Sequence, residues 1–334
     1  MFMMRRIVKA VFWLALAAVL LLTAFVAVQY HRAPSLEPYR PLTLPAADKA
    51  APGPVQVRFG GVATLVFDDG ETAWMTDGFF SRPGVLATAI TRIGPDAQRI
   101  DDGLRRMGVT RLAAVVPVHS HYDHAMDSPV VAQRTGARLI GSASTMHIGR
   151  GLGLPASQLQ QVESGEPVRL GRFTLRFIAS RHSPTPYSDG HSVERIDSDL
   201  VPPQRATAWR EGTVWSIHVA HDGGRTWLVQ GSAGFVPGAL AGLRAETVFL
   251  GTGTLGKKPE AYREQFWNET VKAVGARQVL PIHWDNFWRP LELPLQAMPL
   301  LLDDFEVVMQ DLQARGLRDG VRIRMPPLFV PFTL

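Results

Sequence analysis

The sequence predicts an α/β fold in which two β-sheets pack face to face with helices outside them, preceded by one apolar helix. Short alternating apolar runs punctuated by glycine open the folded part, as in consecutive antiparallel strands. A second set of hairpins lies further along the chain, and helical patterns come after each set. Hairpins followed by helices, repeated in two halves, indicate two sheets with helices outside.

The first segment, 1–30, is expected to be an N-terminal membrane anchor or signal segment. Arg5, Arg6 and Lys9 precede an uncharged apolar run from Ala10 to Val28. About 17–25 apolar residues span a bilayer as a helix, whereas the apolar part of a cleaved signal peptide usually has about 7–15. We favour a retained, single-pass anchor in the inner membrane over a cleaved signal. The basic flank then predicts that the rest of the chain lies on the periplasmic side.

The next segment, 31–54, is rich in proline and alanine, which is typical of an extended tether. The folded domain is expected over 55–334. Hydrophobic residues make up 46% of the chain, which supports a packed core.

The charge and the missing residue types restrict the chemistry. The net charge is +5, but no basic stripe with aromatic residues is present, so no nucleic-acid partner is expected. The chain has no cysteine, so disulfides and thiolate ligands are excluded. Any metal must be held by histidine, aspartate or glutamate.

The first half of the domain reads as three short strands, a helix, two strands separated by a loop, and a second helix. The glycine-punctuated runs are consistent with a meander, and glycine ends the second helix. The expected elements are strands within 55–61, 63–70 and 72–78, a helix within 96–109, strands at 112–118 and 137–141, and a helix within 142–153.

The second half begins with two hairpins and ends with alternating strands and helices. The second hairpin turns at Asp222-Gly223-Gly224, a sequence suited to a tight turn. The expected elements are hairpins at 166–180 and 213–232, strands at 247–251, 278–282 and 320–325, and helices at 259–274 and 301–314.

The stretch "VVPVHSHYDHAMD" places three histidines and an aspartate directly after a predicted buried strand. In an extended chain residues i and i+2 point the same way, so His119 and His121 can share one metal. Asp123 and His124 lie further on and can face a second metal. Zinc accepts imidazole and carboxylate ligands in about four-coordinate geometry, and two ions about 3.5–4 Å apart can hold a hydroxide.

These residues resemble a known family. "HSHYDH" is similar to the H-x-H-x-D-H signature of the metallo-β-lactamase fold superfamily. The opening strands resemble those of the superfamily, with Asp77 at the acidic position of "MTDG". "IASRHSP" supplies His182 and "LPIHWD" supplies His283, each after a predicted strand.

The resemblance implies a four-layer αββα sandwich with two zinc ions per chain, although manganese or iron would also suit these ligands. It assigns His119, His121 and His182 to one metal. It assigns Asp123, His124 and His283 to the other. Asp123 is also the expected catalytic residue, which orients the attacking hydroxide.

Asp77 is expected to accept a hydrogen bond from a ligand histidine and so fix its tautomer. One departure from the family pattern concerns Ser232. Many relatives carry an aspartate in a Gly-Asp-Thr segment that bridges both metals, whereas this chain reads "VQGSAGF". A serine is a poor zinc ligand, so the resemblance implies two metals without a bridging carboxylate.

Tyr187 and His191 are candidates for binding substrate, because they lie in a long polar insertion after His182. His147, His218 and His221 are expected to be structural or surface residues. The aromatic segment "WDNFW" after His283 either lines the pocket or packs in the core.

The resemblance implies a metal-dependent hydrolase that uses a metal-bound hydroxide on an ester, lactone or phosphodiester. The opening strands and "SRHSP" look most like the branch with ascorbate-phosphate lactonases and phospholipase-D-like enzymes acting on N-acyl phosphatidylethanolamines. A membrane anchor suits a small-molecule, lipid-derived or envelope-derived substrate. A periplasmic β-lactamase is the alternative, and an iron-dependent oxidoreductase is the alternative from another class.

Overall fold

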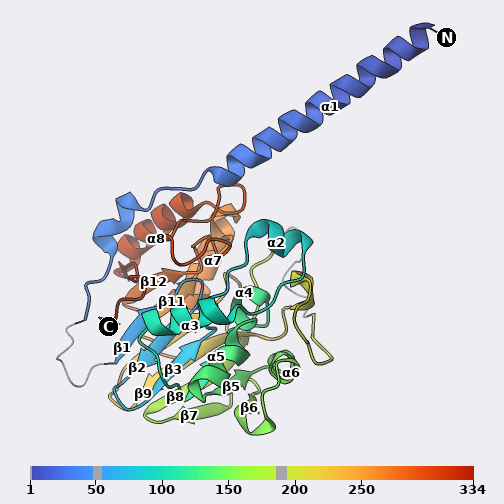
Figure 1. Ribbon diagram of the computed structural model, residues 1–334. Coiled ribbons are helices and arrows are strands. Elements are labelled where there is room, and N and C mark those ends of the chain that lie inside the picture. Colours follow the sequence, from blue (N-terminus) through green and yellow to red (C-terminus); the bar gives the residue numbers. More distant parts are fainter. Residues whose placement is uncertain (1, 48–54, 186–193) are drawn as a thin grey trace.

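The computed structural model describes residues 2–47, 55–185 and 194–334, and it confirms the two-sheet α/β architecture (Figure 1). Each sheet has seven strands. In spatial order the first sheet contains β14 (Phe332–Thr333), β1 (Gln56–Phe59), β2 (Leu65–Asp68), β3 (Ala73–Thr76), β4 (Ala114–Val116), β5 (Arg138–Gly141) and β6 (Leu159–Gln161). The second contains β13 (Arg322–Ile323), β12 (Gln278–Ile282), β11 (Thr247–Gly251), β10 (Thr226–Gln230), β9 (Val214–His221), β8 (Phe173–Ser180) and β7 (Pro167–Leu170).

Each sheet changes from antiparallel to parallel pairing along its width. Strands β1, β2 and β3 pair as an antiparallel meander, and β3 to β6 pair in parallel. Strands β7 to β10 are antiparallel, and β10 to β13 are parallel. Parallel strands end at the same edge of a sheet, so the loops after β4 and β12 lie where ligands usually bind in α/β folds.

The core between the sheets is aromatic. Phe67 stacks on Trp74 with ring centroids 4.7 Å apart, and it meets Phe249 of the second sheet edge to face. The side chains of Phe67, Trp74 and Phe249 are fully buried. Burying a large apolar side chain contributes roughly 1.5–3 kcal/mol, so this cluster holds the two sheets together.

Helices cover the outer faces of both sheets. The outer core of the first sheet includes Ile100 and Leu104 from α3 and Val131 from α5. Asp96 caps α3 by accepting a hydrogen bond from the Arg99 amide. The helices of the domain are α2 (Val85–Ile90), α3 (Ala97–Arg106), α4 (Tyr122–Ala125), α5 (Ser128–Thr135), α6 (Ala143–Gly151), α7 (Glu260–Trp267), which continues as a π-turn over Asn268–Lys272, and α8 (Phe305–Asp319).

The N-terminal helix α1 (Phe2–His31) projects away from the domain (Figure 1). Its segment Met4–His31 is long and apolar enough to cross a membrane. The helix ends at the domain surface, where the Arg32 carbonyl accepts a hydrogen bond from the Leu300 amide at 2.8 Å.

Part of the expected tether is docked on the domain. Residues Glu37–Leu42 form a 3₁₀-helix, and Tyr39 is buried edge to face against Phe305 of α8. The Leu44 amide then donates to the Met325 carbonyl at 3.0 Å. An extended chain was expected here because proline and alanine dominate the segment. The burial of one tyrosine and the backbone pairing that follows it hold residues 36–44 on the domain instead.

Candidate metal centre

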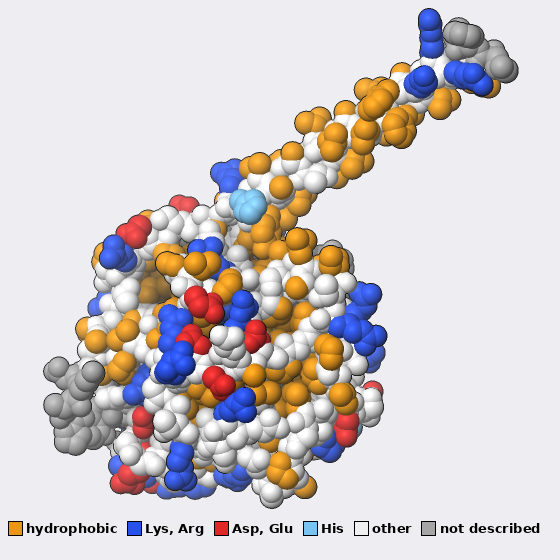
Figure 2. Space-filling model, viewed as in Figure 1, with side chains coloured by type: hydrophobic (Ala, Val, Ile, Leu, Met, Phe, Trp, Pro, Cys, Tyr) orange, Lys and Arg blue, Asp and Glu red, His pale blue; other side chains and the backbone are white. Residues whose placement is uncertain are grey.

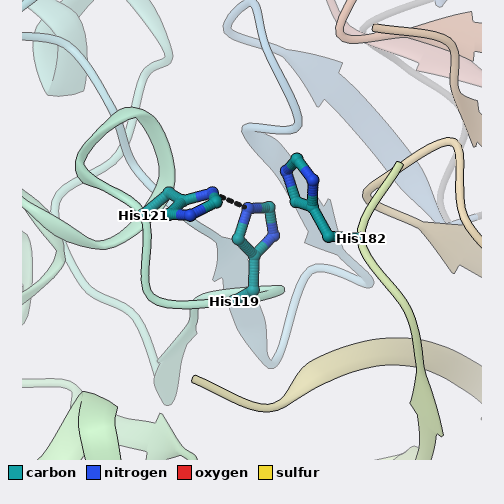
Figure 3. Close-up of side chains that lie close together, drawn as sticks. All are labelled: His119, His121 and His182. Atoms are coloured by element: carbon teal, nitrogen blue, oxygen red, sulfur yellow. Dashed lines mark hydrogen bonds between the residues drawn. The ribbon is translucent and has the colours of Figure 1, made fainter. Parts of the chain in front are cut away.

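The first group of potential ligands joins the two sheets. His119 and His121 follow β4 of the first sheet, and His182 follows β8 of the second (Figure 3). The His119 Nε2 and His121 Nδ1 atoms are 3.1 Å apart. The His182 ring centroid lies 5.0 Å from that of His119 and 4.7 Å from that of His121. The ligand atoms of all three lie within 4.8 Å of one another.

The second group contains Asp123 and His124 of α4 and His283, which follows β12 directly. The Nε2 atoms of His124 and His283 are 3.1 Å apart. The Asp123 Oδ2 atom lies 3.5 Å from His124 Nε2 and 3.3 Å from His283 Nε2. Zinc–nitrogen bonds of about 2.0–2.1 Å in tetrahedral geometry place two ligand atoms about 3.3 Å apart. The spacing in this group therefore fits one four-coordinate ion.

The two groups are adjacent, because the His119 and His124 ring centroids are only 3.9 Å apart. The buried Nδ1 atoms of His119 and His283 have no hydrogen-bond partner among the described residues. Five imidazoles and one carboxylate form a donor set that suits divalent zinc, and the nitrogen donors also suit iron.

Burial keeps the first group neutral. It lowers the pKa of His119 far below the usual range, with a further contribution from the neighbouring histidines. It also lowers the pKa of His121 to about 4 and that of His182 to about 3. Metal binding requires deprotonated ligands, so these three side chains are in the binding form at neutral pH.

The second group is charged differently. Burial opposes ionisation of Asp123, but His124 and His283 outweigh it and hold the pKa of this carboxyl below its usual range. Burial also lowers the pKa of His124, yet the carboxylates of Asp77 and Asp123 outweigh it, and the net shift is upward. Asp123 is therefore ionised and available as an anionic ligand.

Asp77 fixes the orientation of His124. Its Oδ2 atom lies 2.7 Å from His124 Nδ1, and its Oδ1 accepts a hydrogen bond from the Val118 amide at 2.9 Å. A carboxylate can only accept, so Nδ1 of His124 carries the proton. The free Nε2 then points toward His283 and Asp123.

The backbone around these side chains is in an unusual conformation. His283, Asp77 and Val62 have positive φ angles of 57°, 55° and 50°. Such φ angles cost roughly 1–3 kcal/mol each in residues other than glycine. The His283 amide donates to the Val62 carbonyl, and the Val62 amide donates to Asp285, which forms a fully buried ion pair with Arg82 at 2.6 Å. These contacts hold His283 in place.

The candidate ligands open into a pocket of about 1070 Å³. Its lining combines polar residues, among them Ser183, Glu194, Glu211, Lys257 and Asp303, with apolar residues, among them Trp209, Phe287, Trp288, Met298, Leu301 and Leu302. Part of the "WDNFW" segment therefore lines the pocket.

Ser232 lies beside the loop that carries His182. Its hydroxyl accepts a hydrogen bond from the Ser183 amide at 2.9 Å, and the Ser183 hydroxyl contacts that of Thr254 at 2.6 Å. Ser232 is buried and also lines the pocket. It thus supports the backbone next to a candidate ligand.

Two pocket residues were not anticipated from the sequence. Burial, helped by the nearby Glu194, raises the pKa of Glu211 to about 7. The Tyr122 hydroxyl accepts a hydrogen bond from Trp288 Nε1 at 3.1 Å. Tyr122 occupies a variable position of the hexapeptide, and nothing in the sequence around Glu211 marked it as a pocket residue.

The remaining sequence candidates lie elsewhere. Tyr187 and His191 fall outside the described residues. The other histidines are engaged away from the cluster. Their contacts are His147 Nδ1 with Asp199 at 2.9 Å, His218 Nε2 with the Arg244 carbonyl at 2.8 Å, and His221 Nε2 with Asp69 at 3.1 Å.

Comparison with known proteins identifies relatives by fold and over one stretch of sequence. No family model matches the chain. A UPF0173 metal-dependent hydrolase of Chloroflexus aurantiacus is 30% identical over 82 residues, which are 25% of this chain and 34% of the relative. The match thus spans about a third of that curated relative.

Two solved structures resemble the whole domain. Igni18, a metallo hydrolase from Ignicoccus hospitalis, superposes with a TM-score of 0.53 at 15% identity, covering 84% of this chain and 98% of its own. A possible metal-dependent hydrolase from Veillonella parvula gives a TM-score of 0.50 at 13% identity, covering 85% and 100%. Together with the two seven-stranded sheets and the clustered ligands, these likenesses show that the chain has the metallo-β-lactamase fold.

Proposed function

We propose that this protein is a metal-dependent hydrolase that binds two zinc ions through His119, His121 and His182 and through Asp123, His124 and His283. The observation that carries the proposal is the spacing of the second group. Its three ligand atoms are 3.1, 3.3 and 3.5 Å apart, close to the edge of a tetrahedral zinc site. The relatives in both sequence and structure are named as metal-dependent hydrolases, which supports the same class of reaction.

Bound zinc lowers the pKa of a coordinated water from 15.7 to about 7 and so supplies a nucleophile at neutral pH. The protein contributes position and charge. Asp123 is ionised and lines the pocket, so it can accept a hydrogen bond from the attacking water and orient it. The substrate would be an ester, lactone or phosphodiester. Glu211, whose pKa of about 7 leaves it partly protonated at neutral pH, lines the same pocket and can donate a proton to a leaving group.

The proposed location is the inner membrane, with α1 as a single-pass anchor and the domain on the periplasmic side. The length and apolarity of α1 support the anchor, and the basic residues before its apolar run support the orientation. A reporter fused after Leu334 should be active only outside the cytoplasm. A reporter that is active in the cytoplasm would contradict this orientation.

The hydrolase proposal is tested with the full-length protein in mild detergent, purified without added metal. We expect close to two zinc ions per chain and hydrolysis of at least one ester, lactone or phosphodiester in a substrate screen. A chelator should abolish the hydrolysis, and zinc should restore it. Hydrolysis of β-lactams alone would identify a β-lactamase. Iron in both positions without any hydrolysis would favour an oxidoreductase.

A further inference from the structure

The end of α1 is fixed to two segments that also form the pocket. The Arg32 carbonyl accepts a hydrogen bond from the Leu300 amide, directly before the pocket residues Leu301 and Leu302. The Tyr30 side chain lies close to that of Asn286, directly before the pocket residues Phe287 and Trp288. The pocket residues of these two segments therefore lie next to the end of α1.

The helix geometry places these contacts close to the bilayer surface. The apolar run ends at Val28, and four further residues at about 1.5 Å per residue place Arg32 about 6 Å beyond it. The head-group layer on each side of a bilayer is roughly 5–7 Å thick. If α1 spans the membrane, the contact between Arg32 and Leu300 lies within or directly against that layer.

Exposed apolar side chains also lie on the part of the domain nearer α1, where α2 is found (Figure 1). None of the six residues of α2 is buried, and its Leu86 and Ile90 are 73% and 70% exposed. Leu301, on the pocket wall, is 45% exposed. Figure 2 shows apolar side chains along α1 and further apolar side chains on the domain at its base. Leu86, Ile90 and Leu301 are called the apolar rim below.

Helix α2 lies next to the pocket residue Tyr122. The Thr88 side chain of α2 lies close to the Tyr122 hydroxyl, which accepts a hydrogen bond from Trp288 Nε1. Tyr122 and Trp288 both line the pocket. Within the apolar rim, Leu301 lines the pocket that contains the candidate metal ligands, and Leu86 and Ile90 belong to the helix beside the pocket residue Tyr122.

We infer that the apolar rim rests in the outer surface of the membrane that α1 spans, so that the pocket opens onto the bilayer. This inference rests on the proposed membrane anchor and deepens the proposed function. A substrate would enter from the lipid phase, with an apolar chain against Leu301, Leu302 and Phe287 and its hydrolysable group at the metal ligands. The substrate class is an amphiphile that partitions into the bilayer.

The absence of cysteine makes a direct test possible, because a single introduced cysteine can carry a fluorescent label. The full-length variants Leu86→Cys, Ile90→Cys and Leu301→Cys are labelled with an environment-sensitive dye and reconstituted in phospholipid nanodiscs. Val19→Cys, within α1, is the control for the anchor. Glu166→Cys is the control for a solvent-exposed position beside β7, at the end of the domain far from α1 (Figure 1).

Quenching is measured with lipids that carry a nitroxide either near the head group or deep in the acyl chain. We expect the shallow quencher to remove most of the fluorescence at positions 86, 90 and 301 and to leave position 166 unchanged. The deep quencher should act mainly at position 19. Quenching at 19 without quenching at the apolar rim would overturn the inference while leaving the anchor intact, whereas no quenching at 19 would reject the anchor itself.

A second comparison tests whether the apolar side chains cause the contact. The substitutions Leu86→Gln and Ile90→Gln are added to the labelled Leu301→Cys protein. They should clearly reduce the lipid quenching of the label at position 301. Adding Leu317→Gln, a matched change at a leucine that is 89% exposed on α8, should leave it unchanged. The labels on the apolar rim could instead quench one another only when a nanodisc holds two proteins. That result would show that a second copy of the chain covers this face, and it would also overturn the inference.

Discussion

The Asp77 carboxylate and the His124 imidazole meet at 2.7 Å with both side chains fully buried. The pair links the turn after β3 to α4, and it leaves His124 Nε2 facing His283. Because Asp77 also accepts from the Val118 amide, it couples the orientation of one candidate ligand to the end of the strand that precedes the cluster.

Asp77→Asn should therefore weaken metal binding without removing a ligand. Asparagine tolerates the positive φ of this position and can still accept from Val118, but it carries no charge to support the Nδ1 proton of His124. Loss of such a partner typically lowers metal affinity about 10–100-fold. Competition with a chromogenic chelator measures this change.

The chain offers a matched control for this variant. Asp69 contacts His221 at 3.1 Å in the same manner but away from the candidate ligands. Asp69→Asn should leave the metal content and the chelator resistance at the wild-type level. Equal losses in both variants would mean that Asp77 acts through stability alone.

His121→Ala should remove one metal and nearly all hydrolysis. The imidazole is neutral at neutral pH because burial lowers its pKa to about 4, and its Nδ1 faces His119 Nε2 at 3.1 Å. His147→Ala is the suitable control, since His147 pairs with the exposed Asp199 at the surface. The ligand assignment is tested by measuring the metal content by mass spectrometry and the hydrolysis rate on the same preparations of both variants. A comparable effect of His147→Ala would contradict the ligand assignment.

Local patterns in the sequence allowed the two-sheet fold class and the cluster of candidate ligands at 119–124 to be predicted, whereas the grouping of all six ligands came from the family resemblance. Alternating runs and the spacing of His119, His121, Asp123 and His124 are visible within a few residues. His182 and His283 were recognised because each follows a strand in the order typical of the family. The structure brings all six side chains together in the two predicted sets.

Contacts between distant segments could not be predicted in the same way. Nothing near Tyr39 indicates that it packs on Phe305, so residues 31–54 were expected to be extended. The buried pair of Arg82 and Asp285 joins residues about two hundred positions apart and exists only once both sheets have formed. Glu211 becomes a pocket residue for the same reason.

Asp127 should make the stability of the domain depend on pH. Burial raises its pKa from 3.8 to about 6, despite hydrogen bonds from Ser81 and the Phe80 amide. The native state then binds a proton more tightly than the unfolded state does, so this group's contribution to stability falls as pH rises from about 4 to 6. The shift corresponds to roughly 3 kcal/mol, which is fully lost above pH 6.

Asp127→Asn removes this dependence, because the amide is neutral at every pH and can still accept from the two backbone amides. We expect the free energy of unfolding of the variant, relative to wild type, to increase by about 2 kcal/mol between pH 4.5 and 7.5. Urea denaturation of both metal-free proteins at several pH values measures the difference between their free energies of unfolding. The contributions of the other titrating groups are the same in both proteins and cancel in this difference. Parallel pH profiles would show that Asp127 has an ordinary pKa.

The last prediction concerns Ser232, which the family resemblance places at the position of a bridging aspartate. Its hydroxyl now accepts from the Ser183 amide and so supports the loop of His182. A carboxylate at this position can accept the same hydrogen bond and also adds a negative charge beside the candidate ligands. At contact distance that charge is worth about 1–4 kcal/mol toward a cation, so Ser232→Asp should increase the chelator resistance of the second metal roughly tenfold or more.

Ser232→Asn is the matched control, because it has nearly the same size and can accept the same hydrogen bond without the charge. It should leave the retention of the second metal close to wild type. Titration with a chelator, with the bound metal counted at each step, compares the retention of the second metal in wild type, Ser232→Asp and Ser232→Asn. Hydrolysis can change in either direction in Ser232→Asp, because a carboxylate that holds both metals also makes the attacking oxygen less nucleophilic. Metal retention is therefore the deciding measurement, and equal retention in all three proteins would mean that Ser232 does not occupy the bridging position.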